Sequence, residues 1–347
     1  MNNNKMEELQ SRIELYDNAE DLVGSFDGHL GKNAVRINDD RAALKKKREE
    51  GLMDIKKTAK DSLFFGELFR ALMSKKSHYK TYMNDLFTGK KSDMYIPESV
   101  SCIVKRSQNN SDCQLEAIGS RLANLFAVDT VYNLAIESDE QDEYEDYPTY
   151  DAIVSVDCIP YGYRIQTFKD LQLWFNEDSS LEEVMHTIDK KFDVIANKNG
   201  LGYAPEKLTE LKKKFAYQFM FRNLVCEDYD FCDKNTAMLI GENGDFKLAP
   251  CFDMELLFRG RKSHVYFASF ANQTIDYLMK NMPDVLSGFM QRYREVVSSS
   301  ELEQVVKRSV KVDPKYTTDI YNHILHNYKR LSSFVAEHNQ NHELAED

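Results

Sequence analysis

Residues 219–258 read FMFRNLVCEDYDFCDKNTAMLIGENGDFKLAPCFDMELLF, and we expect the rest of the chain to be organised around this stretch. Apolar residues recur at helical spacing over residues 206–226, which predicts an amphipathic helix leading into it. An acid-rich loop follows at residues 227–235. Residues 236–240 and 246–249 are strand-like and flank the turn sequence ENGD, which predicts a β-hairpin.

The chemistry of this stretch lies in Asp230, Asn235 and Asp253. The helix and the hairpin hold the two ends of the loop, and the hairpin returns the chain so that Asp253 can face it. Two carboxylates and an amide oxygen suit Mg²⁺, a hard cation that shares oxygen ligands with phosphates. Kinases use one Asp near the attacking hydroxyl, and an Asn and an Asp on the metal ions. The spacing alone also fits an ordinary acidic loop before a hairpin.

The motifs carry a resemblance to a known family. Residues 228–235 read DYDFCDKN, and residues 248–253 read LAPCFD. The stretch resembles the catalytic core of HipA-like kinases, whose loop N-x-D-x-H-x-x-N is followed by a hairpin and an L-A-P-x-x-D segment. This family comprises toxin kinases of bacterial toxin–antitoxin pairs, with relatives among secreted effector kinases.

The resemblance implies that Asp230 is the catalytic Asp and that Asn235 and Asp253 are the metal ligands. Two residues depart from the family pattern, because Asp228 stands where the family has Asn and Cys232 where it has His. Neither position is a metal ligand in this interpretation, so the chemistry can survive both changes.

A second pair of residues fits a nucleotide site. Lys105 ends an apolar, strand-like run, and Pro97 places the start of that strand near residue 99. A helix is predicted at residues 114–126, with Glu116 on its first turns. Kinases use such a strand Lys and helix Glu to orient the α- and β-phosphates. A surface Lys and a Glu favoured by the helix dipole are the alternative.

The same helix, QLEAIGSRLANLF, matches an E-x-x-x-x-R-L-A pattern that HipA-like kinases have after the lysine strand. Kinase-like folds also place a turn before that strand, where backbone N–H groups contact phosphates. Residues 88–93 offer Gly89 for this turn, with Lys90, Lys91 and Ser92 beside it. The two lysines are candidate phosphate contacts, and by family analogy Ser92 is a candidate self-phosphorylation site.

Other segments complete the expected kinase-like outline. Residues 24–32, GSFDGHLGK, fail the Walker pattern and are interpreted as a turn. Strands are predicted at residues 131–136 and 151–156, and DCIPY at 157–161 would be the hinge that meets the adenine, with Cys158 as a contact.

The remainder of the chain is predicted to be helical. SLEE at residues 180–183 is a capping box that opens a helix ending at Asn199-Gly200. SELE at residues 300–303 opens another helix, and Asp313-Pro314 opens the last. His323 and His326 share a face of that last helix, where solvated side chains are a better interpretation than a metal site.

Composition limits the class of protein. The 347 residues carry a net charge of −12, so sequence-independent binding to nucleic acid is not expected. No apolar run reaches the ~20 residues that a membrane span needs. The N-terminus has no apolar signal-peptide core, which favours a cytoplasmic protein, although secretion into a host cell without a cleaved signal leaves no trace. The six Cys form no C-x-x-C pair.

These observations predict an α+β, two-lobed protein-kinase-like fold with a small β-rich N-lobe and a mostly helical C-lobe. The expected parts are a polar, helix-leaning segment at 1–60, an N-lobe at 61–160, and a C-lobe at 161–347 with its catalytic loop at 226–258. The expected function is ATP- and Mg²⁺-dependent Ser/Thr phosphorylation of a protein, self-phosphorylation included, by a toxin or effector with an antitoxin or regulatory partner. The alternatives are a catalytically weak pseudokinase-like binding module and a small-molecule or lipid kinase.

Overall fold

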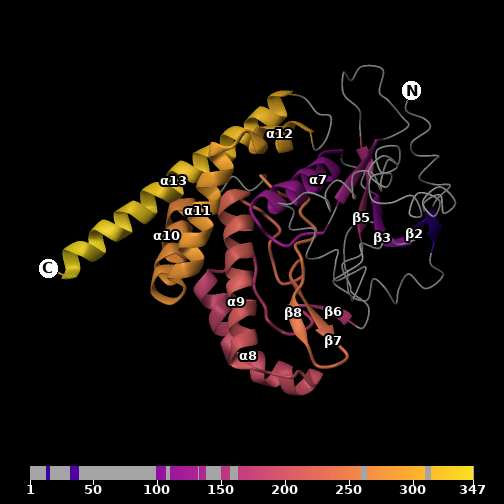
Figure 1. The fold of residues 1–347 in the computed structure, drawn as a ribbon, viewed down its shortest axis with the longest axis horizontal. Helices are drawn as coiled ribbons and strands as arrows, with labels where there is room; N and C mark the ends of the chain where they lie inside the picture. The colour runs from indigo at the N-terminus through magenta and orange to yellow at the C-terminus, as the bar shows by residue number, and fades with distance from the viewer. Residues whose placement is uncertain are drawn as a thin grey trace, which may run out of the picture.

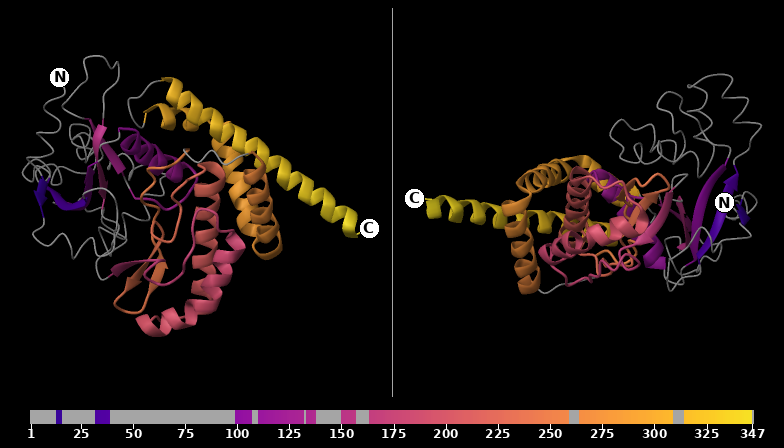
Figure 2. Two further views of the ribbon diagram at one scale, coloured as in Figure 1. Left: turned by 180° about the vertical axis from the view of Figure 1, so that it is seen from behind. Right: turned by 90° about the horizontal axis from the view of Figure 1, so that it is seen from below.

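The computed structural model describes residues 13–15, 32–38, 99–106, 110–131, 133–137, 150–156, 163–258, 264–308 and 314–346. These residues form a mixed α/β structure that is mostly helical. Figure 1 shows a larger sheet at one end of the molecule, a small sheet near its middle, and helices over the rest. The C-terminal part of the last helix projects beyond the other helices in every view (Figure 2).

The larger sheet has five antiparallel strands in the order β1-β2-β3-β5-β4. Their bounds are Ile13–Leu15 for β1, Lys32–Asn38 for β2, Ser99–Arg106 for β3, Asn133–Glu137 for β4 and Tyr150–Val156 for β5. The strand predicted to start near residue 99 and the two predicted around residues 131–136 and 151–156 are therefore confirmed. Helix α7, Asn110–Leu125, packs on β4 and β5, and confirms the helix predicted at 114–126.

The helix-leaning interpretation of residues 1–60 is wrong where the structure describes them. Both β1 and β2 are strands of the larger sheet. The sequence KNAVRIN of β2 has the two-residue alternation of a strand, and β2 pairs along its whole length with β3. This pairing joins segments more than sixty residues apart, so a local pattern could not show it. The remaining boundaries of the expected parts stay predictions.

The smaller sheet contains the predicted hairpin. Strand β6, Tyr163–Thr167, pairs with β7, Ala237–Gly241, which pairs with β8, Phe246–Leu248. Gly244 turns the hairpin with φ 78°, a conformation that glycine adopts without strain. Its carbonyl oxygen accepts a hydrogen bond of 2.8 Å from the backbone of Gly202, so the hairpin tip is fixed to the connection between two helices.

Helices α8 to α13 form the body of the molecule. Their bounds are Leu181–Asn199 for α8, Pro205–Met220 for α9, His264–Asn281 for α10, Pro283–Ser298 for α11, Ser300–Arg308 for α12 and Pro314–Glu346 for α13. The predicted capping box opens α8, with Ser180 and Glu183 bonding each other's backbone, and Gly200 ends it at φ 63°. The helix starts predicted near Ser300 and at Pro314 are also confirmed.

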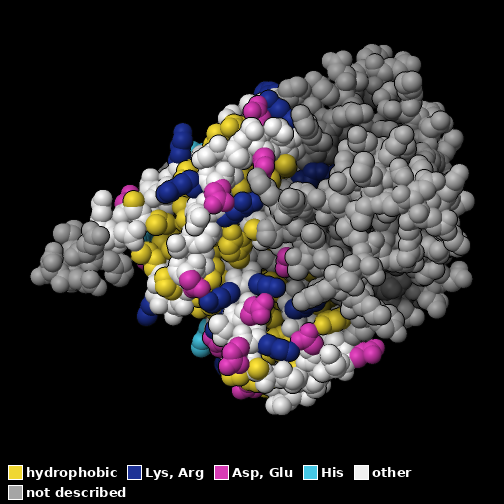
Figure 3. Space-filling view, viewed as in Figure 1, with side chains coloured by type: hydrophobic (Ala, Val, Ile, Leu, Met, Phe, Trp, Pro, Cys, Tyr) yellow, Lys and Arg dark blue, Asp and Glu magenta, His cyan; other side chains and the backbone are white. Residues whose placement is uncertain are grey.

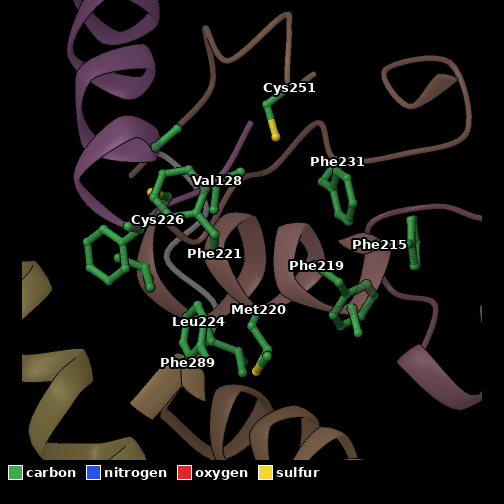
Figure 4. Packing of buried hydrophobic residues seen from close by; sticks show 14 of the residues in the cluster. Val128, Phe215, Phe219, Met220, Phe221, Leu224, Cys226, Phe231, Cys251 and Phe289 are labelled. Atoms are coloured by element: carbon green, nitrogen blue, oxygen red, sulfur yellow. The ribbon is translucent and has the colours of Figure 1, made fainter. Parts of the chain in front are cut away.

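The core is rich in aromatic rings, several of them on α9 and the turn that follows it (Figure 4). It packs the end of α7 against residues 221–225, which follow α9, and against α11. Phe126, just past the end of α7, lies 5.4 Å from Phe221 and 5.0 Å from Tyr293 between ring centroids. Arg292 on α11 donates a 2.7 Å hydrogen bond to the carbonyl oxygen of Leu125, where the last turn of α7 lacks helical partners. The position of α7 is therefore set by the helical body as well as by the sheet.

Several predicted features lie outside the described residues. These are the turn candidates Gly89, Lys90, Lys91 and Ser92, and the hinge residue Cys158. Of the helices that the structure describes, none has the length and apolar character to cross a membrane.

Candidate active site

Asp230 and Asn235 are joined by hydrogen bonds within the loop that follows α9. The Asn235 amide nitrogen, Nδ2, donates to Asp230 Oδ2 at 2.7 Å and to the Asp230 carbonyl oxygen at 3.0 Å. Both partners are acceptors, so only the amide nitrogen can face them, and the Asn235 amide oxygen points away from Asp230. The loop therefore holds these two side chains against each other.

Asp253 reaches the same place from the other side of the hairpin. It lies five residues past β8 and has φ 50°, a left-handed conformation that is uncommon for residues other than glycine. Residues held in such conformations cluster at functional sites. Its charge is close enough to Asp230 to help raise the pKa of that carboxyl.

The pKa of Asp230 is raised above its usual value. Burial is the largest cause, and the charge of Asp228 adds to it. The hydrogen bond from Asn235 and the charge of Arg222 act in the opposite direction. A carboxylate with a raised pKa is a better acceptor for a hydroxyl proton than an ordinary Asp.

Arg222 joins the loop of Asp230 to the segment of Asp253. Its side chain is 1% exposed and pairs with Asp228, whose side chain is completely buried. The guanidinium donates Nε to Asp228 Oδ2 at 2.5 Å, Nη1 to the carbonyl oxygen of Asn235 at 3.1 Å, and Nη2 to that of Asp253 at 3.0 Å. One buried cation thus bonds the backbone of both predicted metal ligands. Sequence reasoning missed it, although an Arg inside the apolar run FMFRNLV is the signal that could have found it.

Asp228 completes this arrangement. Its other carboxylate oxygen, Oδ1, accepts from the backbone N–H of Asp230 at 3.1 Å. Burial is the largest single influence and disfavours the charge of Arg222, but the neighbouring groups, with Asp228 foremost among them, together outweigh it, so the pKa of Arg222 is raised. The departure from the family pattern at residue 228 therefore has a partner in Arg222, and the two charges neutralise each other.

The end of α9 shapes this geometry. After Met220 the chain makes a π-helical turn, Phe221–Val225, in which Cys226 N–H bonds the carbonyl oxygen of Phe221 at 3.1 Å. Such turns are rare in proteins, and those that do occur often lie at functional sites. The turn contains Arg222, whose own carbonyl oxygen accepts from Asp228 N–H at 2.8 Å. The π-helical turn thus ties the start of the loop to the residue that holds it.

Cys232 lies beside Asp230, where the family has His. Its thiol faces Asp230 Oδ1 with the sulfur 4.0 Å from that oxygen. Burial is the main cause that raises the pKa of this thiol. A protonated thiol is a weak donor, so Cys232 takes the place of a hydrogen-bonding residue without adding charge to the site.

Glu116 lies on α7 and is 1% exposed. The side-chain amide of Asn133, on β4, donates to it at 3.4 Å. A carboxylate so deeply buried requires polar partners, as expected of a residue that positions another charge. Lys105 lies on β3, where the structure describes the backbone but not the side chain, so the predicted pairing of Lys105 with Glu116 stays a prediction.

Helix α7 also touches the segment that follows Asp253. A side-chain carbon added to Gly119 would lie 2.5 Å from Leu257 Cδ1 and 3.2 Å from Met254 Cβ. The absence of a side chain is therefore what allows this close approach. Past the end of α7, Thr130 and Cys251 form a parallel β-bridge, with Cys251 N–H donating to the carbonyl oxygen of Asp129 at 2.8 Å. Glu116 and Asp253 are consequently carried by parts of the chain in direct contact.

The strand register adds one basic residue that the sequence pattern did not indicate. Lys32, the first residue of β2, is directly opposite Lys105 in the sheet. Residues 24–32, interpreted above as a turn, end there. In the sequence, the segment 88–93 instead precedes Ser99, the first residue of β3. Ser99 and Lys105 are six residues apart along the extended strand, so they are roughly 20 Å from each other. The register thus places Lys32, and not the start of β3, level with Lys105.

The residues present fit a magnesium ion. Asp230, Asn235 and Asp253 supply two carboxylates and an amide oxygen, which is a hard oxygen set. Among the described residues, no three His, Cys, Asp or Glu side chains gather around one point. A site with few protein ligands matches the way Mg²⁺ shares its shell with phosphates.

The face seen in Figure 3 shows basic and acidic side chains interspersed over the described surface. No broad area of that face carries Lys and Arg alone.

No protein-family model matches the sequence, and no curated protein sequence matches it. Solved structures do. The Helicobacter pylori proinflammatory kinase CtkA is similar at 12% identity with a TM-score of 0.45, over 71% of this chain and 92% of that one. HipA, from the Shewanella oneidensis MR-1 toxin–antitoxin complex of HipA, HipB and operator DNA, is similar at 13% identity with a TM-score of 0.46.

The match covers 70% of this chain and 63% of HipA, so this chain spans less than two thirds of the length of HipA. The roles of individual residues rest on the geometry of this chain alone. The resemblance to HipA-like kinases carried by the DYDFCDKN and LAPCFD motifs is thus accompanied by structural similarity to a kinase and to HipA, at low sequence identity.

Proposed function

We propose that the protein is a two-lobed, HipA-like kinase that transfers the γ-phosphate of ATP to a Ser or Thr hydroxyl of a protein. The observation that carries this proposal is the joining of Asp230, Asn235 and Asp253 through direct hydrogen bonds and the shared Arg222. An ordinary acidic surface loop has no reason to bury an arginine against the backbone of both partners.

Asp230 orients the substrate hydroxyl and accepts its proton. Its raised pKa suits this role, and its hydrogen bond from Asn235 fixes the direction of the carboxylate. Asn235 and Asp253 would hold Mg²⁺ through their side-chain oxygens, and the ion would neutralise charge on the phosphates. Much of the rate enhancement comes from positioning and from preorganised charge.

On the other side of the site, Lys105 contacts the phosphates and Glu116 positions Lys105. The burial of Glu116 on a helix anchored by Phe126 and Arg292 supports this role, because the helix holds the carboxylate in one place. Lys90, Lys91, Ser92 and Cys158 remain candidate nucleotide contacts, with Ser92 as a candidate for self-phosphorylation.

The biological role that we propose is that of a toxin or effector. The HipA structure is named for a toxin–antitoxin system with HipB, and by analogy this chain would have a protein substrate and an antitoxin or regulatory partner. Expression of the wild-type chain should then inhibit growth, whereas Asp230→Asn should not. Equal growth inhibition by the variant would remove kinase activity as the cause.

The decisive experiment is incubation of the pure protein with γ-labelled ATP and Mg²⁺, with and without a lysate. Wild-type protein should transfer label to protein, and Asp230→Asn and Asp253→Asn should reduce the transfer by about 10²–10⁴-fold. Asp233→Asn is a matched control, because Asp233 is in the same loop but has no hydrogen bond to Asn235 or Arg222 among those described.

The outcomes separate the alternatives. Label on a metabolite or lipid and on no protein would replace the proposal with a small-molecule or lipid kinase. Absence of label, together with no shift of the melting temperature by Mg²⁺-ATP, would indicate a binding module built on a kinase scaffold.

A further inference from the structure

The C-terminal helix α13 contacts the loop of Asp230 at Glu227. Glu227 is 3% exposed and immediately precedes Asp228. Its Oε1 accepts from Asn327 Nδ2 at 3.2 Å, and lies 3.6 Å from His323 Nε2 and 3.8 Å from Arg330 Nη1. Residues 323, 327 and 330 share one face of a helix by their spacing, so this face of α13 is directed at a single carboxylate. The side chain of His323 is 28% exposed and contacts Glu227, so the solvation expected of it is only partial.

Asn327 is the centre of this contact. It is completely buried, and its Nδ2 also donates to the carbonyl oxygen of Val225 at 3.3 Å and lies 3.0 Å from His323 Nε2. Because the Val225 and Glu227 oxygens are both acceptors, the amide nitrogen must face the loop. One side chain of α13 thus holds the end of the π-helical turn and the first residue of the loop.

The backbone at Glu227 needs such support. Its φ is 45°, in the left-handed region that glycine adopts easily and other residues adopt at a cost. A strained residue persists only where surrounding contacts over-determine it. The side chain of Glu227 supplies those contacts, which a glycine at the same position would lack.

Movement at Glu227 would be transmitted directly to Asp230. The next residue, Asp228, binds the backbone N–H of Asp230 at 3.1 Å. The same face of α13 also touches the segment after Asp253, since the His323 ring packs edge-on against Phe258 with centroids 5.5 Å apart. In addition, Tyr293 donates to the carbonyl oxygen of Ile324 at 2.8 Å, which fixes α13 along its axis.

We propose that α13 positions the catalytic loop through Glu227, and that Asn327 is the positioning residue on which this contact depends. The inference rests on the proposed function for its effect on catalysis. The contact itself is a property of the fold and can be tested without activity.

The test compares Asn327→Leu with Asn322→Leu, a matched change at an exposed position of the same helix. Hydrogen exchange by mass spectrometry should show the amides of residues 227–230 exchanging roughly tenfold faster in Asn327→Leu, with α9 unaffected. The kcat for label transfer should fall roughly tenfold while the KM for ATP changes by less than about twofold, because positioning is lost and nucleotide binding is kept. Asn322→Leu should match wild type in both measurements.

Two further variants separate positioning from general loosening. Glu227→Gly relieves the backbone strain but removes the side chain, and should exchange as fast as Asn327→Leu. Ile188→Ala removes a buried side chain of α8 and leaves every contact of α13 with Glu227 in place, so it should lower the melting temperature without a selective change at residues 227–230. Wild-type exchange in Asn327→Leu, or the same kcat loss in Ile188→Ala, would overturn the proposal. If the wild-type protein is inactive, the proposed function is wrong, but hydrogen exchange at residues 227–230 still decides whether α13 holds the loop.

Discussion

Arg222 and Asp228 lie six residues apart in the sequence and form a buried ion pair, with Arg222 Nη2 2.5 Å from Asp228 Oδ2. The pair is more than a local contact. Through it, the residue that caps Asp230 is bonded to the guanidinium that also holds the backbone of Asn235 and Asp253. The geometry of the candidate active site therefore depends on one buried charge.

Replacement of Arg222 should lower the stability of the folded protein. Removing one partner of a buried pair leaves the other uncompensated, so Arg222→Met should reduce the free energy of unfolding by about 3–5 kcal/mol. The loss of stability can be measured by urea unfolding, followed by the fluorescence of Trp174, the only tryptophan in the chain. The exposed pair Lys213–Asp284 gives a control, because Lys213→Met should cost less than about 1 kcal/mol.

The double variant Arg222→Met, Asp228→Asn extends this prediction. With both charges removed, the amide oxygen introduced at position 228 can still accept the N–H of Asp230, so the double variant should be more stable than Arg222→Met alone. If the destabilisation of the double variant equals the sum of the destabilisations of Arg222→Met and Asp228→Asn, the two residues do not act as a pair.

Asp230→Asn should make the protein more stable at neutral pH while it reduces label transfer. The folded pKa of Asp230 is raised, chiefly by burial, so the folded state binds this proton more tightly than the unfolded chain. Ionised Asp230 therefore subtracts stability once pH rises through the folded pKa. The gain should be within the roughly 0.5–2 kcal/mol of single stabilising changes.

The pH dependence checks the cause of this gain. Below about pH 3.9, the usual pKa of Asp, the carboxyl is protonated in both states and the difference between Asp230→Asn and wild type should vanish. Urea unfolding across a pH series measures this difference in the free energy of unfolding, and Asp193→Asn, at an exposed position of α8, is the control. A stability difference that does not change with pH would show that its origin is not the charge of Asp230.

Two glycines in helices should respond in opposite ways to alanine. Gly119→Ala places a carbon 2.5 Å from Leu257 Cδ1 and 3.2 Å from Met254 Cβ, so the buried Leu257 side chain or α7 itself must shift, at a cost of about 1–3 kcal/mol. Gly288→Ala, in α11, meets nothing within 4 Å and should stabilise the protein by about 0.5–1 kcal/mol. Thermal unfolding of both variants decides the matter, and a neutral Gly119→Ala would mean that α7 and this segment do not pack closely.

Glu116→Gln should weaken nucleotide binding. A lost hydrogen bond to a charged group costs about 1.5–3 kcal/mol, so the Kd for Mg²⁺-ATP should rise by roughly 10–100-fold. Isothermal titration calorimetry measures this Kd, and Glu206→Gln, at an exposed position in the first turn of α9, provides the comparison. An unchanged Kd would argue against a pairing of Glu116 with Lys105.

The sequence by itself determined the local elements and the identity of the chemical groups. Helical spacing, the capping box at Ser180 and the ENGD turn each arise from interactions between near neighbours, and the structure contains α8, α9 and the hairpin where those patterns lie. Asp230, Asn235 and Asp253 could be chosen because oxygen ligands at a loop and at a hairpin exit suit a hard cation.

Only the tertiary structure decided how these groups are held. The pairing of β2 with β3, the bonds from Arg222 to Asn235 and Asp253, and the contact of Asn327 with Glu227 join residues far apart in the chain. Local patterns carry no information about such contacts, because their free energy comes from burial and charge pairing that exist only when the distant segments meet.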